Sequence, residues 1–352
     1  MTLQRHILRV VGIRVLAAWV VLVSILQILD LLDVTTDILD RKLGVAGVAY
    51  YAALRLPTLA QQVAPLAVLA GCLFAFAQLA RENAVVALRS AGMSAYRLIG
   101  MTAPVAIAVV VAHLAAVQWL APRADQALDA WWARSAPRAE QAPKGPRSFR
   151  VGTDIVVASA GDEAGRRLTG VSLYRRAPDG RLVERIHAEA ATFGPKGWTL
   201  VQPRLEMIGG LGVQRASAGQ MLWTTGPAPQ DVRAIFGTDQ TLAPGSARRA
   251  LSGGASARSP SFYRTELQRG FAAPIGGLVM LLLAGPVTLT NFRSGGAQVL
   301  VSCLGAGLLF LVVDGICTAM GQGGSVPALL GAWGAPVAFA AAGASALVFM
   351  EG

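Results

Sequence analysis

Six long hydrophobic segments divide the chain into two groups of three, with a polar segment over residues 121–262 between the groups. The apolar runs cover residues 10–32, 56–79, 98–120, 271–289, 299–320 and 327–349. A helix needs about 20 apolar residues to cross a bilayer, because backbone groups in lipid must be hydrogen-bonded within the segment itself. The pattern therefore predicts six transmembrane helices and one large domain between the third and the fourth.

The middle of the polar segment changes to short β-type runs separated by turn residues. The runs cover residues 149–159, 168–176, 181–193 and 198–207, and Asp179-Gly180 predicts a hairpin turn between two of them. Evenly spaced short strands are typical of an antiparallel sandwich or jelly roll. Before them, residues 123–138 keep helical character, and after them residues 244–260, rich in Gly, Ser, Ala and Arg, predict a flexible linker.

The composition supports a membrane protein. Of 352 residues, 54% are hydrophobic and only 14% are charged, which is too apolar for a soluble protein of this length. The first run is long and lacks a small-residue cleavage pattern, so we expect it to stay as an anchor. Cys72, Cys303 and Cys317 fall within predicted spans, where cysteine usually acts as a small apolar residue, and they indicate neither a disulfide nor a metal site.

Arginines in the short loops predict the orientation, because cationic residues near span ends are retained on the cytoplasmic side. They are Arg5, Arg9 and Arg14 near the N-terminus, Arg81, Arg89 and Arg97 after the second span, and Arg293 after the fourth. The alternate loops have balanced charge or none. We therefore expect both termini in the cytoplasm and the large insert outside.

The insert carries 19 Lys+Arg against 12 Asp+Glu between residues 121 and 262. Long translocated domains do not follow the loop-charge rule, so this excess has another origin. One interpretation is the general arginine bias of the chain. The other is attraction to an anionic ligand or lipid headgroup.

Candidate chemistry is sparse. The chain has no phosphate-binding loop, since none of its three lysines (Lys42, Lys144 and Lys196) stands in a Gly-x-x-x-x-Gly-Lys-Ser/Thr motif. The three histidines, His6, His113 and His187, are too scattered in the sequence to indicate a metal site or proton relay. Asp314 lies inside the fifth span, where a facing helix or a polar cavity must satisfy its carboxylate.

The loop after the second span has the pattern of a short amphipathic helix. Val85, Leu88 and Tyr96 fall near one helical face, and Gly92 can end or kink the helix. Such a helix between two spans usually rests on the lipid surface. It also has the shape by which a membrane subunit docks into a soluble motor.

Short segments in every part of the chain follow the order and spacing of one family. They are Leu29-Asp-Leu-Leu32, Leu56-Pro57, Pro65, Gly71, Ala87-Leu-Arg-Ser-Ala-Gly92-Met-Ser94, Gln118-Trp-Leu-Ala-Pro122, Leu168-Thr-Gly-Val-Ser-Leu-Tyr, Gly180-Arg-Leu, His187-Ala-Glu-Ala, Gly197-Trp-Thr-Leu, Asp314, Gly323 to Pro327, and Gly331-Ala-Trp333-Gly-Ala-Pro336. In these segments the chain resembles the LptF/LptG (YjgP/YjgQ) permeases of the lipopolysaccharide-export ABC transporter, and the LptG branch more than the LptF branch.

The resemblance implies an α-helical membrane protein with six transmembrane helices (3+3) and an inserted all-β periplasmic jelly-roll-like domain. Residues 1–121 would hold the first three helices, residues 122–262 the β domain and residues 263–352 the last three helices. Such a permease lies in the inner membrane of a Gram-negative bacterium, extracts lipopolysaccharide from the outer leaflet and passes it to periplasmic bridge proteins. It pairs with a second, LptF-like six-span permease and a dimeric cytoplasmic ATPase.

The resemblance also implies that this chain is non-catalytic, binds no cofactor directly and has no nucleic-acid partner. ATP and Mg would be used by the partner ATPase. The absence of a phosphate-binding loop agrees with this expectation.

Site residues carried over by the resemblance fall into two groups. The coupling helix, about residues 81–92, would seat in the ATPase through Arg81, Glu82, Val85, Leu88, Arg89 and Gly92. The first and fifth spans would line the lipid gate, with Gln27, Asp30 and Asp314 near it and Arg41, Lys42, Arg123 and Arg134 at its outer rim as phosphate contacts. Two positions depart from the family pattern: Ala84 replaces the usual acidic coupling residue, with Glu82 two residues earlier, and Gln27 replaces a lysine.

Two other functions are compatible with six spans and a β insert. A non-transporting scaffold or sensor is one alternative, but a sensor needs an output domain, and the inner loops are short. A secondary transporter driven by protons through Asp314 is another; it would predict inverted repeats, and the two halves of the chain show none.

Overall fold

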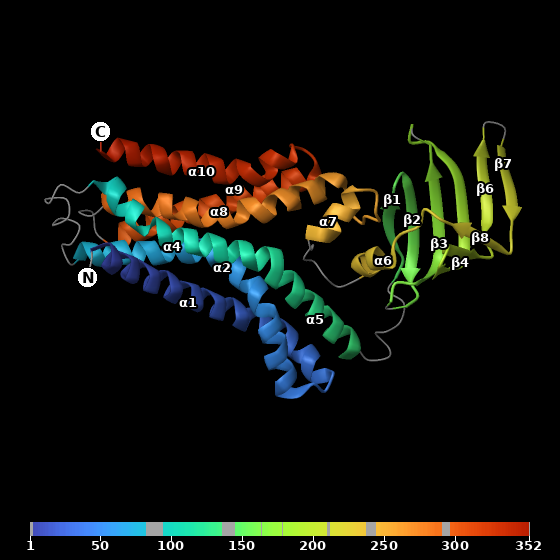
Figure 1. Ribbon diagram of the computed structural model, residues 1–352, viewed down its shortest axis with the longest axis horizontal. Coiled ribbons are helices and arrows are strands. Elements are labelled where there is room, and N and C mark those ends of the chain that lie inside the picture. Colours follow the sequence, from blue (N-terminus) through green and yellow to red (C-terminus); the bar gives the residue numbers. More distant parts are fainter. Residues whose placement is uncertain are drawn as a thin grey trace. The chain divides into compact units, whose positions relative to one another are not determined.

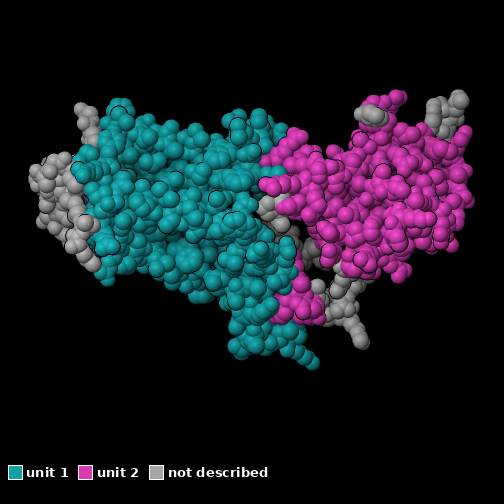
Figure 2. Space-filling view, viewed as in Figure 1, with its two compact units in different colours: residues 1–128, 265–352 teal, residues 129–264 magenta. Residues whose placement is uncertain are grey.

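The computed structural model describes residues 3–81, 94–135, 145–162, 164–177, 179–209, 212–236, 244–290 and 296–351. The chain forms two compact units, coloured teal and magenta in Figure 2. The membrane unit consists of Met1–Leu128 and Thr265–Gly352, and the β unit consists of Asp129–Arg264.

Long apolar helices build the membrane unit. They are α1 (Leu3–Asp40), α2 (Gly44–Arg81), α4 (Ala95–Ala115) with the π-helix η1 (Ala116–Leu120) and α5 (Ala121–Ser135) continuing it, α8 (Pro260–Thr290), α9 (Gly296–Gly323) and α10 (Ala328–Glu351) (Figure 1). Six helices in the described part of the chain are long and apolar enough to cross a membrane, which confirms the predicted spans. The predicted helical extension of the third span is also present, as α5.

Helix α2 forms the centre of the membrane unit. In its most apolar stretch 67% of the residues are buried, against 11% in α1. Gly71 lets α1 approach α2 closely, because a Cβ at this position would lie 2.4 Å from the Cα of Val15. A second close crossing joins α9 to α10, where a Cβ on Gly321 would lie 2.9 Å from the Cα of Gly331. Small residues at such crossings allow the backbone approach that drives helix packing in lipid.

An eight-stranded antiparallel sheet builds the β unit. Its strands are β1 (Arg147–Val151), β2 (Asp154–Ala160), β3 (Arg167–Arg176), β4 (Leu182–Gly194), β5 (Gly197–Val201), β6 (Arg204–Gly209), β7 (Gly212–Ser217) and β8 (Gln220–Trp223). The order is β1-β2-β3-β4-β5-β8, and the sheet branches at β4. Glu184–His187 of β4 pairs with β6, while Ala190–Gly194 pairs with β5. The sheet confirms the prediction of an antiparallel all-β insert.

One face of the sheet holds the core of the β unit. Leu173, Ile186 and Trp198 are fully buried there, and α6 (Pro229–Phe236) packs on it through an edge-to-face contact of Phe236 with Phe149. The indole N–H of Trp198 donates to the carbonyl of Pro227 at 2.6 Å. The hydrogen bond satisfies the one polar group of this side chain, so the ring can be buried completely.

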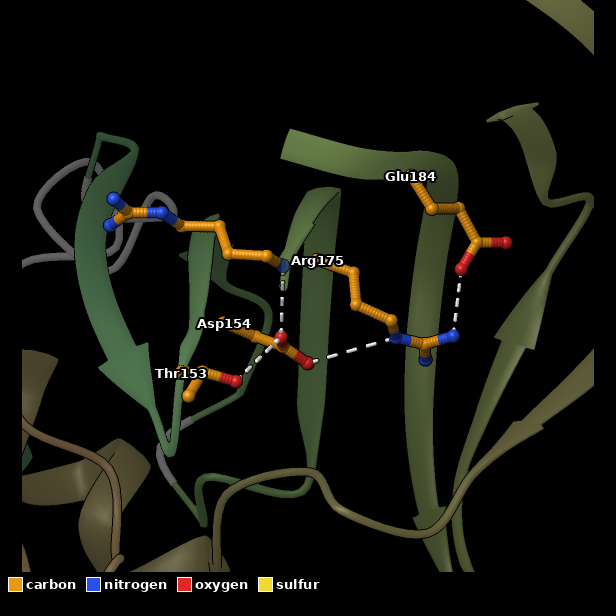
Figure 3. A network of polar contacts seen from close by, with 5 residues as sticks. Thr153, Asp154, Arg175 and Glu184 are labelled. Carbon is orange, nitrogen blue, oxygen red and sulfur yellow. Dashed lines mark hydrogen bonds and ion pairs between the residues drawn. The ribbon is translucent and has the colours of Figure 1, made fainter. Parts of the chain in front are cut away.

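A charged row closes the same face beyond the apolar core. Arg175 lies between Asp154 and Glu184, at 3.8 Å and 2.7 Å from their carboxylates (Figure 3). These residues stand opposite one another on β2, β3 and β4, one row beyond Val156, Leu173 and Ile186. Both carboxylates are mostly buried, and the shared guanidinium supplies the charge partner that burial requires.

The hairpin predicted at Asp179-Gly180 joins β3 to β4. Gly180 has a φ of +86°, and the backbone N–H of Arg181 donates to the Asp179 carboxylate at 3.0 Å. This backbone bond, with the Arg181 side chain, lowers the pKa of Asp179 below its ordinary value, because both stabilise the ionised carboxylate.

The structure corrects several predicted boundaries. The expected strand at residues 149–159 is two strands, because Gly152 turns the chain with a φ of +61°. The run at residues 198–207 is also two strands, since Gln202 adopts a φ of +50° before Pro203. Strands β7 and β8 and helix α6 were not predicted.

The predicted flexible linker contains regular structure. Helix α7 (Pro244–Leu251) lies within it, and Ser256 forms a backbone bridge with Arg150 of β1. Arg249 of α7 pairs with the buried Asp231 of α6 at 3.4 Å. Composition alone missed this helix, because α7 is held by tertiary contacts rather than by an apolar face of its own.

Replacing Gly71 with Ala should destabilise the membrane unit, because the added methyl group would overlap the backbone of Val15. Overpacking of this kind costs about 1–3 kcal/mol, so we expect the Tm in detergent to fall by several degrees. Gly305→Ala in α9 is the matched control, since nothing lies within 4 Å of its added Cβ. Equal Tm values for the two variants would contradict the close α1–α2 crossing.

Candidate functional site

An ion pair joins α1 to α2 in the membrane unit. Arg55 of α2 donates to the carboxylate of Asp30 on α1 at 3.2 Å, and both side chains are more than half buried. The buried Tyr51 lies beside the same carboxylate. Arg55 thus compensates the charge of Asp30, which the resemblance predicts to lie near a lipid gate.

Unused hydrogen-bonding capacity lies next to this pair. Gln27 precedes Asp30 by three residues, which places the two side chains on the same face of α1. Within the described residues, neither amide atom of Gln27 has a hydrogen-bond partner, and neither does the second carboxylate oxygen of Asp30. Buried polar atoms without partners are costly, so this position favours a further polar group, supplied by water, a partner or a ligand.

A polar ladder joins α8 to α9. Arg269 pairs with Asp314 at 3.3 Å and donates to the hydroxyl of Thr318, while Gln322 donates to Glu266 at 2.6 Å. The three residues of α9 are four positions apart and therefore share one face. Arg269 supplies the partner that the sequence required for Asp314.

A third polar contact was not predicted. Thr58 of α2 donates to Asp125 of α5 at 2.9 Å, and Asp125 is only 4% exposed. The second oxygen of Asp125 has no partner in the described part of the chain. The π-helix η1 ends five residues earlier, and π-helices often occur at functional sites. Asp125 could have been found in the sequence as an acidic residue in the predicted helix that continues the third apolar span.

The other predicted gate residues lie at several places. Arg41 and Lys42 form the turn between α1 and α2, where Lys42 adopts a φ of +59°. Arg123 and Arg134 lie on α5, and Arg134 donates to the carbonyl of Ala130 in its own helix at 2.9 Å. Asp30 pairs with Arg55 of α2 and Asp314 with Arg269 of α8, and the described residues show no contact between the two acids.

Most of the predicted coupling helix lies outside the described residues. This applies to Glu82, Val85, Leu88, Arg89 and Gly92. Arg81 is the last residue of α2. The assignment of this segment to ATPase docking stays a prediction.

Comparison with known protein families shows which family this chain resembles. The family model described as "Lipopolysaccharide export system permease LptF/LptG" matches residues 5–348. A search of curated proteins found no match. The family match includes all six candidate spans nearly to their ends, together with the whole β unit.

Removing the guanidinium of Arg269 should destabilise the protein, because the Asp314 carboxylate would stay in the span without a charge partner. We expect Arg269→Met to cost about 1–3 kcal/mol, and the double variant Arg269→Met/Asp314→Leu to recover much of this loss. Thermal unfolding in detergent, analysed as a double-mutant cycle, measures the coupling.

Arg264→Met on the same helix is the control, since Arg264 is exposed and makes no ion pair among the described residues. Additive effects of the Arg269 and Asp314 substitutions would show that the pair contributes nothing to stability.

Proposed function

Because the chain belongs to the lipopolysaccharide export system permease LptF/LptG family, we propose that it extracts lipopolysaccharide from the outer leaflet of the inner membrane. The lipid then passes to periplasmic bridge proteins, and a separate ATPase supplies the energy. The match over residues 5–348 carries this proposal, since it covers the spans and the β unit together. The protein is a multi-pass inner-membrane permease subunit. The direction of lipid transport and the identity of its partners are proposed.

A second six-span permease is the first proposed partner. Helices α1 and α9 both leave large apolar side chains exposed, among them Leu16 and Ile28 on α1 and Leu308 and Ile316 on α9. Only 11% and 22% of their most apolar stretches are buried within this chain. Lipid or another helix must cover these faces. We place the two halves of the lipid gate there, each completed by the partner permease.

The polar groups of α1 fit such a gate. Among the described residues, the amide of Gln27 and the second oxygen of Asp30, the partner of Arg55, are buried without a hydrogen-bond partner. Polar groups of a lipid headgroup could bond to them, while the apolar side chains would contact its acyl chains. Asp314 has a different role in this proposal, because its pairing with Arg269 fixes the rotation of α9 and so determines which apolar side chains face outward.

The β unit is proposed to lie in the periplasm and both termini in the cytoplasm. This orientation follows from the arginines of the short loops. It places the loop of residues 82–93 in the cytoplasm, where an ATPase can bind it, and the basic β unit on the side where an anionic lipid leaves.

Charge reversal in the coupling segment should weaken ATPase binding without unfolding the protein. The wild-type chain should copurify with an ATPase and a second six-span permease, whereas Glu82→Arg and Arg89→Glu should each recover less ATPase. The exposed Arg97 of α4 provides the control variant Arg97→Glu. The measurement is the ratio of ATPase to permease after mild detergent extraction, with the Tm checked for each variant.

Unchanged ATPase recovery in both variants would overturn the coupling assignment. Isolation of the wild-type chain as a stable monomer under the same conditions would contradict the proposed function itself, and would favour a scaffold or sensor.

A further inference from the structure

A row of six residues crosses the outer face of the sheet, opposite the apolar core. Successive strands place Arg150 opposite Ile155, Ile155 opposite Tyr174, Tyr174 opposite Arg185, Arg185 opposite Glu206, and Glu206 opposite Arg215. Residues directly opposite one another on neighbouring strands share a face of the sheet. The row therefore runs from β1 to β7 and contains three arginines and one acid.

The two ends of this row differ in charge. At the β7 end, Glu206 pairs with both Arg185 and Arg215, at 3.7 Å and 3.3 Å, and Arg185 also lies over the ring of Tyr174. At the β1 end, Arg150 makes no ion pair among the described residues, and neither does the nearby Arg258. Positive charge is thus partly compensated by Glu206 at one end and left uncompensated at the other.

A groove of about 270 Å³ lies at this uncompensated end. Its walls come from β1, the start of β2 and the segment that precedes α8; the lining includes Ser148, Arg150, Ile155, Ser256, Arg258 and Ser259. Two backbone hydrogen bonds between Arg150 and Ser256, both of 2.8 Å, hold the walls together. Two exposed guanidinium groups and several serine residues therefore share one groove, and the lining contains no acidic residue.

Packing holds both arginines of the groove in position. Arg150 belongs to β1, whose neighbouring Phe149 is buried in the core, and the guanidinium of Arg258 lies 4.5 Å from the centre of the Phe262 ring. Stacking on an aromatic ring restricts the side chain and leaves the edge of the guanidinium open for hydrogen bonds. Ser259 caps α8 by accepting from the N–H of Phe262 at 3.3 Å, which fixes the end of the segment.

We propose that this groove binds one phosphate group of an anionic lipid headgroup, with Arg150 and Arg258 as its ligands. Arginine bonds phosphate oxygens through two parallel N–H groups, and the groove is smaller than the usual pocket for a whole drug-sized ligand, which is about 300–1,000 Å³. Every residue that lines the groove belongs to the β unit, and Pro260 at its edge is the first residue of α8.

The inference rests on the proposed function, because it needs the β unit on the side from which the lipid leaves. The phosphate could belong to the transported glycolipid or to an anionic phospholipid of the surrounding leaflet. Both present the same chemistry to the two arginines, so the probes must separate them.

The test measures binding of lipid probes to the full-length protein purified with its partners. The probes are diphosphoryl lipid A, phosphatidylglycerol and, as a neutral reference, phosphatidylcholine. Arg150→Gln/Arg258→Gln should weaken the binding of at least one anionic probe about tenfold or more, with phosphatidylcholine unchanged. Arg150→Lys/Arg258→Lys, which keeps the charge but loses the bidentate geometry, should weaken it less.

Arg215→Gln is the matched control, since Arg215 is exposed on the same face but is paired with Glu206. A loss confined to diphosphoryl lipid A assigns the groove to the transported lipid, and a loss confined to phosphatidylglycerol assigns it to the surrounding leaflet. Unchanged affinity for both anionic probes would overturn the inference, as would an equal loss in Arg215→Gln.

The two proposals can fail separately. If the wild-type complex moves lipopolysaccharide in an ATP-dependent manner while the Gln variant binds both anionic probes normally, the assignment of a phosphate site to the groove is wrong and the proposed function stands. If the wild-type complex moves no lipopolysaccharide, but the Gln variant binds phosphatidylglycerol more weakly than the wild type does, the phosphate site stands and the proposed function is wrong.

Discussion

The absence of water inside the bilayer governs the membrane unit. Backbone groups there must bond within helices, and a polar side chain in a span needs a partner from another helix. Asp30 has Arg55, Asp314 has Arg269 and Asp125 has Thr58. These contacts tie α1 to α2, α9 to α8 and α5 to α2, so the few polar residues of the spans also determine which helix faces are in contact. The apolar faces of α1 and α9 stay available for lipid or for another subunit.

The β unit meets a different constraint, because water can solvate one face of its sheet. Its inner face buries a core with Trp198 at one end and the Asp154–Arg175–Glu184 row at the other (Figure 3). Its outer face can carry charge at low cost, and there the positive charge is unevenly distributed. Glu206 partly compensates Arg185 and Arg215 near β7, while Arg150 and Arg258 near β1 make no ion pair among the described residues. Two of the arginines in the sequence excess, Arg150 and Arg258, thus lie together in one groove.

The spans were predictable because each is one long apolar run, and a run of that length forms few structures other than a transmembrane helix. The β insert was predictable as a class, and the turn at Asp179-Gly180 was located correctly, because its residues favour one backbone geometry. The strand breaks at Gly152 and Gln202 were missed, although the turn residues Gly152-Thr153-Asp154 and Gln202-Pro203 are visible in the sequence. The partners of Asp30 and Asp314 could not be predicted either, because Arg55 and Arg269 are distant in sequence and only helix packing brings them close. Asp125 was overlooked because its partner Thr58 on α2 is 67 residues away in the sequence.

ATP-dependent extraction of lipopolysaccharide tests the central claim most directly. The complex of this chain with its ATPase and second permease would be reconstituted in proteoliposomes that contain lipopolysaccharide, and transfer to a soluble periplasmic acceptor would be followed over time. The family membership and the proposed orientation predict transfer that requires ATP and stops when the chain is omitted. Transfer that proceeds equally without ATP or without this chain would contradict the account.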